Sequence, residues 1–139
     1  MTGAQIMALC RTLPRSEQAL VRDRVKFRVR GIVYVSISPD ESSMGFGFPK
    51  LERNGLIAAE PEKFFLPRTS DLRFNWVCAR LAALDVPEMR ELIIDAWTMV
   101  VPKKVVREFS SRPDRSAGDG GADGSAPYDP KGDEPASHH

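Results

Sequence analysis

A run of alternating cations between Arg22 and Arg30 constrains the fold of this chain more than any other stretch. Lysine or arginine occupies every second position of the run, and apolar residues fill most positions between them. In an extended strand, successive side chains point to opposite faces, so Val25, Phe27 and Val29 would share the face that lacks the cations. Cations two residues apart, roughly 6.6 Å, would form a row about 26 Å long. The row would consist of Arg22, Arg24, Lys26, Arg28 and Arg30.

A second apolar run, residues 32–38, follows after a short turn that contains Gly31. Its β-branched and aromatic residues predict an antiparallel hairpin with the basic strand. A two-residue turn would place Phe27 opposite Tyr34 and surround the cations with apolar neighbours. A three-residue turn through Ile32 would instead leave the cations on a polar face. The apolar pattern favours three residues and turn chemistry favours two; we expect the polar cation face.

The remaining patterns predict three helices and three further strands around this hairpin. We expect helices over residues 4–13, over 50–60 and from the capping residue Asp85 to about Val100, with residues 103–109 adding a helical turn or two. We expect strands over 43–48, 64–66 and 74–81, and a polar connection over 15–18. Together these elements predict one α+β domain of residues 1–109. Its antiparallel sheet would carry an N-terminal helix, a middle helix and a long C-terminal helix.

Residues 110–139 differ from this domain in composition, since Gly, Ser, Asp and Pro dominate them. Such a segment buries too little apolar surface to offset its ordering entropy, so we expect a disordered tail. The domain holds 17 Lys/Arg and 13 Asp/Glu, a net charge of +4, and the tail holds 3 and 6, a net charge of −3. The acidic tail would either compete for the basic face or simply keep the protein soluble.

The residue types of the domain argue against an enzyme. Residues 1–109 contain no histidine, which excludes Ser-His-Asp triads, Cys-His pairs and histidine metal sites from that part. Cys10 and Cys78 lie in apolar segments, so we expect reduced, buried thiols. Carboxylate pairs such as Glu60 and Glu62 are expected to be solvated charges. We therefore expect no catalysis, no metal and no cofactor. Without a transmembrane run or a signal peptide, we also expect a cytoplasmic protein.

Several short motifs follow one another in a recognisable order. These are Phe27-Arg28-Val29-Arg30-Gly31, Lys50-Leu51 with Arg53, Pro61 with Phe64-Phe65 and Pro67, Trp76-Val77, and Glu88, Leu92, Ala96-Trp97 and Pro102-Lys103-Lys104. Over roughly residues 4–107, this order resembles the MmcQ/YjbR family of small bacterial proteins. The resemblance implies a CyaY-like α+β fold. It also implies a double-wing shape associated with DNA binding.

The cation row and the resemblance together favour a non-enzymatic module that binds DNA or another polyanion with little sequence specificity. We expect it to act as a monomer without a membrane partner. One alternative is a protein-interaction module that meets an acidic partner. Another is a small-ligand binder with a pocket between the sheet and the C-terminal helix, lined by Trp76, Trp97, Gly45 and Gly47. The expected nucleic-acid contacts are Arg22, Arg24, Lys26, Arg28, Arg30, Lys50, Arg53, Arg68 and Arg73.

Overall fold

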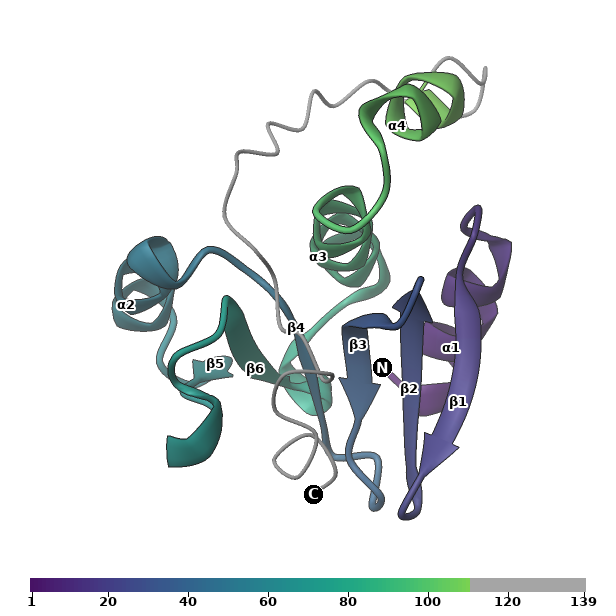
Figure 1. Ribbon diagram of the computed structural model, residues 1–139. Coiled ribbons are helices and arrows are strands. Elements are labelled where there is room, and N and C mark those ends of the chain that lie inside the picture. Colours follow the sequence, from purple (N-terminus) through teal and green to yellow (C-terminus); the bar gives the residue numbers. More distant parts are fainter. Residues whose placement is uncertain (111–139) are drawn as a thin grey trace.

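The computed structural model describes residues 1–110, which form a sheet with helices packed against it (Figure 1). The predicted disordered tail, and the competition expected of its acidic residues, lie outside the described residues. The helices are α1 (Gly3–Thr12), α2 (Lys50–Ala59), α3 (Val86–Thr98) and α4 (Lys103–Ser110). The strands are β1 (Glu17–Val21), β2 (Arg24–Val29), β3 (Ile32–Ile37), β4 (Ser43–Gly47), β5 (Phe64–Phe65) and β6 (Trp76–Arg80). Two short 3₁₀ turns, η1 (Thr69–Asp71) and η2 (Leu81–Ala83), flank β6.

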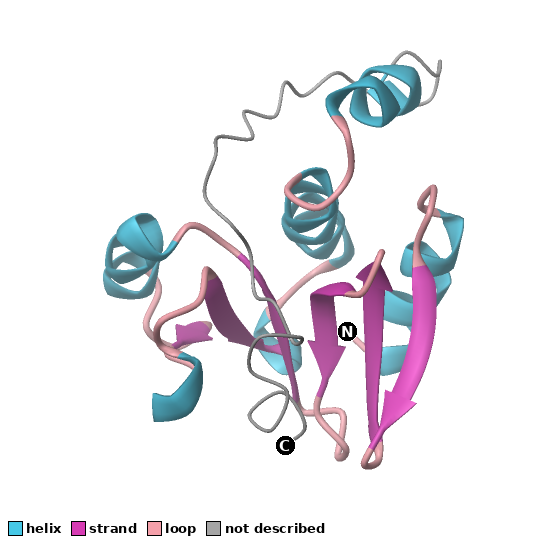
Figure 2. Ribbon diagram, viewed as in Figure 1, coloured by secondary structure: helices cyan, strands magenta, loops and turns pink. Residues whose placement is uncertain are grey.

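All six strands belong to one antiparallel sheet with the order β1-β2-β3-β4-β6-β5 (Figure 2). The predicted α+β class is therefore confirmed, with an N-terminal helix, a middle helix and a long helix near the end of the described chain. Within residues 1–110, no helix is both long enough and apolar enough to cross a membrane.

The helix boundaries follow from local capping chemistry. Thr2 and Gln5 form a reciprocal capping box at the start of α1, in which the Thr2 side chain accepts a hydrogen bond from the Gln5 backbone. The Asp85 carboxylate accepts a hydrogen bond of 2.9 Å from the Glu88 backbone amide and starts α3. The Asp85 cap agrees with the sequence prediction. A break at Pro102 then separates α3 from α4.

The first strand, β1, was not predicted from the sequence, which indicated a polar connection over residues 15–18 and no strand before Arg22. It pairs along its length with β2 through a two-residue turn of Arg22 (φ 52°) and Asp23 (φ 67°). Two consecutive left-handed residues are the backbone signature of the type I′ turn that suits a hairpin. Arg22 thus lies in a turn, and so does Arg30 (φ 54°). The prediction of five cations on one strand face was wrong, because only Arg24, Lys26 and Arg28 lie in β2.

The β2–β3 hairpin satisfies both of the competing turn arguments. Its turn has two residues, Arg30 and Gly31, and both have positive φ. Val29 consequently faces Ile32 across the turn. Further from the turn, however, Phe27 faces Val35 rather than Tyr34.

A β-bulge explains this change of partner. Arg28 pairs with Val33 and Phe27 with Val35, so Tyr34 is an extra residue in β3. Beyond the bulge, the register equals that of a three-residue turn, and the apolar faces of β2 and β3 coincide. The expected separation of apolar and cationic faces therefore holds from Val35 onward, whereas Val33 lies opposite Arg28 and packs with Trp76 on the cation face. The turn length is the one that turn chemistry indicated.

One large apolar cluster lies between the sheet and helices α1, α3 and α4. Trp97 of α3 is fully buried in it, donates a hydrogen bond of 2.9 Å to the Pro14 carbonyl and lies 5.0 Å from the Phe109 ring of α4. Burial of one such side chain contributes about 1.5–3 kcal/mol. The strand residues in this cluster include Phe27, Val29, Val35, Ile37, Met44, Phe46, Val77 and Ala79. Because this main core covers one face of the sheet, only the opposite face of the strands is left to carry a binding surface.

Candidate functional site

The face of the sheet opposite the main core carries most of the predicted binding residues, and we call it the outer face. Residues directly opposite one another in neighbouring strands share a face, so the register defines a row across all six strands. The row runs Ala19, Lys26, Ser36, Gly45, Cys78 and Phe65. Chain neighbours of this row, such as Phe27, Ile37 and Met44, belong to the main core. The row therefore crosses the middle of the outer face.

Three cations of β2 share the outer face. Lys26, in the middle, is only 4% exposed, so most of its side chain is covered. Arg28 is half-buried, and its Nε lies 3.5 Å from a carboxylate oxygen of Glu17 on β1. Arg24 is likewise half-buried. The cations thus form a partly covered group on the sheet, shorter than the predicted row.

The segment between β5 and β6 adds two predicted arginines to the same face. Arg68 Nε lies 3.7 Å from Asp71 Oδ2, and the Arg73 guanidinium lies 4.8 Å from the centre of the Phe74 ring. Phe74 packs against a small second cluster of Val33 and Trp76. The Phe74 contact with Val33 places Arg73 near the strands of the hairpin, and Arg68 acts on Cys78 of β6 together with Arg24 of β2. Cations from two segments that are far apart in sequence therefore lie near the same part of the sheet.

Arg53 does not belong to this surface, although the sequence suggested it as a nucleic-acid contact. It is 8% exposed, and its guanidinium donates to three backbone carbonyls of the segment leading into β6. The acceptors are Trp76 at 2.9 Å, Leu72 at 3.0 Å and Phe74 at 3.2 Å. A guanidinium carries several donors in a fixed fork, which suits it to gather several carbonyls. Arg53 therefore holds the chain in shape and is not presented to a ligand.

Lys50 supports the same segment from the first turn of α2. Its backbone amide donates to Asn75 Oδ1 at 2.9 Å, and its ammonium donates to the Arg73 carbonyl at 2.9 Å. Lys50 is exposed, and its bond to the Arg73 carbonyl places it at the border of the loop that carries the arginines. The lysines of α4 lie on a helix whose buried side joins the main core, so α4 does not extend the outer face.

Gly45 is needed because an indole ring lies against it. A Cβ at this position would lie 2.5 Å from Trp76 Nε1, well inside van der Waals contact. A Cβ at Gly47, by contrast, would lie 3.6 Å from the Cβ of Ala96 in α3. A helix thus approaches the sheet closely at Gly47, whereas a side chain of the sheet itself approaches Gly45.

Replacing Gly45 with alanine is expected to lower the free energy of unfolding by about 1–3 kcal/mol, because the indole must move. Urea unfolding measures this change. Gly55→Ala is the matched control, since nothing lies within 4 Å of a Cβ there. In the middle of α2 this substitution should stabilise the protein by about 0.4–1 kcal/mol. Equal stability of the two variants would contradict the close contact with Trp76.

The pocket suggested for a small ligand is not formed by the expected residues. Trp97 is fully buried in the main core, whereas Trp76 packs on the outer face with Val33. The sheet separates the two indoles, so they cannot line one cavity. The expectation of a shared pocket with Gly45 and Gly47 was wrong, because the glycine positions are filled by Trp76 and by α3.

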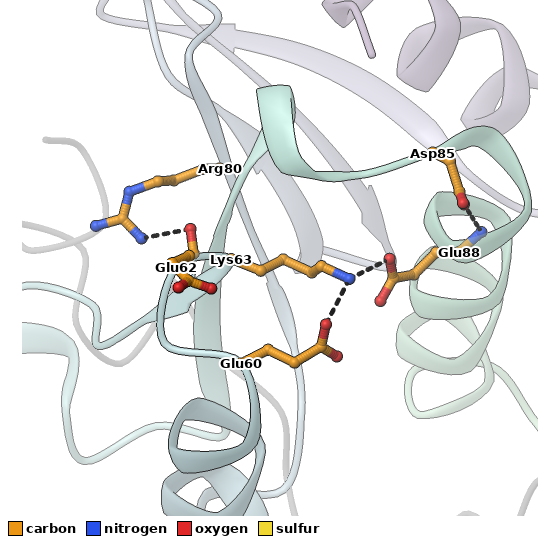
Figure 3. A network of polar contacts seen from close by, with 6 residues as sticks. All are labelled: Glu60, Glu62, Lys63, Arg80, Asp85 and Glu88. Atoms are coloured by element: carbon orange, nitrogen blue, oxygen red, sulfur yellow. Dashed lines mark hydrogen bonds and ion pairs between the residues drawn. The ribbon is translucent and has the colours of Figure 1, made fainter.

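The carboxylates at the start of α3 are engaged in a structural network (Figure 3). Lys63 lies 2.8 Å from Glu60 and 2.7 Å from Glu88, and these two hydrogen bonds raise the pKa of Lys63. Nearby, Arg80 donates to the Glu62 carbonyl at 3.3 Å. The network ties the end of α2 to the start of α3. Across residues 1–110, no three His, Cys, Asp or Glu side chains are grouped as metal ligands.

Both cysteines are protonated at neutral pH. Burial raises the pKa of Cys10 to about 12 and that of Cys78 to about 11. Cys10 is fully buried, as expected, whereas Cys78 is half-buried on the outer face. A thiol is a much weaker nucleophile than a thiolate, so neither residue is set up for covalent chemistry.

Comparison with known proteins gives relatives and a shared fold. No family model matches the chain. The crystal structure of Deinococcus radiodurans protein DR2400, a DUF419 domain, superposes with a TM-score of 0.66 at 18% identity and covers 88% of this chain and 96% of that one. A Pseudomonas syringae protein, structural genomics target PsR293, gives 0.60 at 13% identity and covers 73% and 100%. The fold is therefore shared with a DUF419 domain, which is related to the MmcQ/YjbR-like fold.

Relatives at higher identity come from mycobacteria. The uncharacterized protein Rv2570 of Mycobacterium tuberculosis (strain ATCC 25618 / H37Rv) is 33% identical over 108 residues, which cover 77% of this chain and 75% of the relative. The uncharacterized protein Mb2600 of Mycobacterium bovis matches to the same extent. Identity of this level over most of both chains shows common descent, and the chain belongs to the family of these mycobacterial proteins.

Proposed function

We propose that the outer face binds DNA, or another polyanion, through its phosphates and with little sequence specificity. The observation that carries the proposal is the gathering of cations from two distant segments on one face. Arg24, Lys26 and Arg28 come from β2, and Arg68 and Arg73 come from the segment before β6. Phosphate contacts position a protein on nucleic acid and do not read its sequence.

The relation of the fold to the MmcQ/YjbR family supports this proposal. We assign the chain to an MmcQ/YjbR-like group on the order of its motifs, and the DUF419 neighbour is in keeping with that assignment. The DNA-binding shape associated with the family then points to the same class of ligand. An acidic protein partner would use the same cations and is the alternative to be separated by experiment.

The salt dependence of duplex binding tests the proposal. If Arg24, Arg28 and Arg73, which are more exposed than Lys26, each neutralise one phosphate, log K should fall with log salt with a slope of about −2.7. Titration of a fluorescent 20-base-pair duplex between about 50 and 200 mM salt measures this slope. Arg24→Gln should reduce its magnitude by about 0.9, because one phosphate contact is lost.

Lys104→Gln provides the matched control, since it removes one exposed cation from α4, away from the outer face. Its slope should equal that of the unmodified protein. Absent binding, or binding that salt does not weaken, would contradict a polyanion surface. Either result would favour an acidic protein partner as the ligand of the cations on the outer face.

A further inference from the structure

The two edges of the sheet are not equally protected against pairing with a further strand. At one edge, β5 has only two residues and lies between Pro61 and Pro67, which have no backbone amide to donate. At the other edge, β1 has five residues and contains neither Pro nor Lys (Figure 1). Short strands, prolines and lysines are the usual means by which a sheet edge avoids a partner. In the described part of the chain no strand pairs with the outer edge of β1, which is therefore open.

The backbone of β1 presents two residues to this open edge. A two-residue turn joins β1 to β2, and Val21 lies opposite Arg24 across it. Residues that flank such a turn exchange hydrogen bonds, and hydrogen-bonded and non-hydrogen-bonded pairs alternate from there. Ala19 and Val21 therefore bond to β2, whereas the amide and carbonyl groups of Gln18 and Leu20 point to the open edge.

Leu20 adds an apolar side chain to the same edge. It is 71% exposed, although its partner on β2, Val25, packs against the main core. Leu20 thus lies on the face of the sheet that α1 covers, where Arg11 donates a hydrogen bond of 3.0 Å to the Gln18 side chain. A strand added to this edge would cover the leucine and satisfy the outward backbone groups at the same time.

A second copy of β1 matches this edge. In an antiparallel pair whose two-fold axis passes between the two Ala19 residues, Gln18 of one copy lies opposite Leu20 of the other. The outward amides and carbonyls of the two strands then bond to each other. The two Ala19 residues form a non-hydrogen-bonded pair, in which the Cα atoms are only about 4.5 Å apart, and a methyl group suits this close approach.

The charges at the two ends of β1 select the same register. Asp23, in the turn after β1, lies beside Arg15 of the second copy, which precedes its β1, and opposite charges across paired strands attract. A shift of the second copy by two residues in one direction would place Glu17 opposite Asp23, and these carboxylates repel. A shift in the other direction would place Arg15 opposite Val21 and lose its attraction to Asp23.

We propose that β1 pairs antiparallel with β1 of a second copy, so that the two sheets join into one continuous sheet about a two-fold axis at Ala19. Because this axis is perpendicular to the sheet, the outer faces of both copies lie on the same side. Ala4 and Ala8 share the exposed face of α1 with Arg11, and their small side chains leave room for the helix of the second copy. A monomer was expected from the sequence, which did not indicate β1 as a strand.

The interface is small, so the dimer should be weak. Stable specific interfaces bury about 1,200–2,000 Å², and one pair of five-residue strands buries less. We therefore expect a dissociation constant of about 10–100 μM. Sedimentation velocity of the full chain between about 1 μM and 1 mM should show a monomer at the low end and a dimer at the high end.

Leu20→Lys is expected to weaken the dimer about tenfold or more, because a lysine on an edge strand opposes pairing. Leu51→Lys is the matched control, since Leu51 is 92% exposed and lies on α2, on the other side of the molecule from β1 (Figure 1). It should associate like the unmodified protein. Equal association of the two variants, or a monomer over the whole concentration range, would contradict the edge pairing.

Disulfide cross-linking tests the register. Gln18→Cys, Ala19→Cys and Leu20→Cys are made singly in a Cys78→Ala background, and the fully buried Cys10 is retained. In the proposed pairing, the two Cα atoms at position 19 are about 4.5 Å apart, within reach of a disulfide. The two at position 18, or at position 20, are roughly 9 Å apart and beyond reach. Oxidised glutathione should therefore convert only Ala19→Cys to a covalent dimer. Cross-linking at 18 or 20 in preference to 19, or at none of the three, would overturn the proposal.

The dimer does not depend on the proposed function, because it rests on the edge of the sheet and not on the cations of the outer face. A chain that stays monomeric but binds duplex DNA with the expected salt slope would remove the dimer alone. A dimer with the expected cross-link that binds no duplex would remove the polyanion surface alone.

Discussion

Replacing Arg53 with methionine is expected to lower the free energy of unfolding by about 3 kcal/mol. The guanidinium donates to the carbonyls of Leu72, Phe74 and Trp76, and methionine leaves all three without this donor. The stem of methionine retains much of the packing, so the loss reports mainly on the hydrogen bonds. Urea unfolding followed by far-UV circular dichroism measures it.

Two further variants make this result specific. Arg90→Met removes an exposed arginine from α3 and should change the stability by less than about 0.5 kcal/mol. Arg53→Lys keeps the charge but lacks the planar fork, so it should recover only part of the loss. If Arg53→Met unfolds like Arg90→Met, water replaces the guanidinium at these carbonyls and Arg53 does not hold the loop.

A marked loss of stability in alkaline solution is the second large effect. Cys10 and Tyr34 are fully buried neighbours in the main core, and Tyr34 Oη lies 2.6 Å from Ser16 Oγ. Burial raises the pKa of Cys10 to about 12 from an ordinary value of 9.0. Burial also raises the pKa of Tyr34, and the nearby Cys10 raises it further. Both groups therefore stay protonated in the folded protein at pH values where the unfolded chain loses their protons.

The sign of the effect follows from proton binding. Above about pH 9 the unfolded chain binds fewer protons than the folded one, so the free energy of unfolding falls as pH rises. Each group contributes up to about 1.4 kcal/mol per pH unit above its unfolded pKa. Cys10 and Tyr34 together should remove about 4 kcal/mol between pH 8 and pH 11. Below pH 8 their contribution is constant.

Urea unfolding at several pH values between 7 and 11 measures this dependence. The double variant Cys10→Ala/Tyr34→Phe isolates it, because all other titrating groups remain. Its stability should fall about 4 kcal/mol less than that of the unmodified protein over the same interval. Parallel pH profiles for the two proteins would show that the buried thiol and phenol titrate normally.

The elements with a strong apolar period could be predicted from the sequence, whereas the edge strand could not. In α3, the stripe through Met89, Ile93 and Trp97 sets both the helix and its buried face. In β1 no residue is fully buried, so its sequence carries no period of two. Its strand conformation depends on pairing with β2, which is a contact between segments that the local pattern does not record.

The candidate site was predictable in its charges but not in their surroundings. Arg53 was expected at the surface because arginine is mostly exposed. The spacing in the sequence did indicate burial. Arg53 lies three and four residues before Leu56 and Ile57, on the packed side of α2. Trp76 carried no such signal. Its place against Gly45 depends on the pairing of β4 with β6, which no local pattern records.

The bulge at Tyr34 has a consequence for how chains of this fold can change in length. It adds one residue to β3 and so reconciles a two-residue turn with an apolar pattern that suits a three-residue turn. Deleting Tyr34 alone would exchange the two faces of β3 beyond that point. Deleting Tyr34 and inserting one residue after Gly31 would restore the pairing of Phe27 with Val35. An insertion in the turn thus compensates for a deletion in the strand, because the two changes together leave the strand register unaltered. A relative with a longer turn needs no bulge.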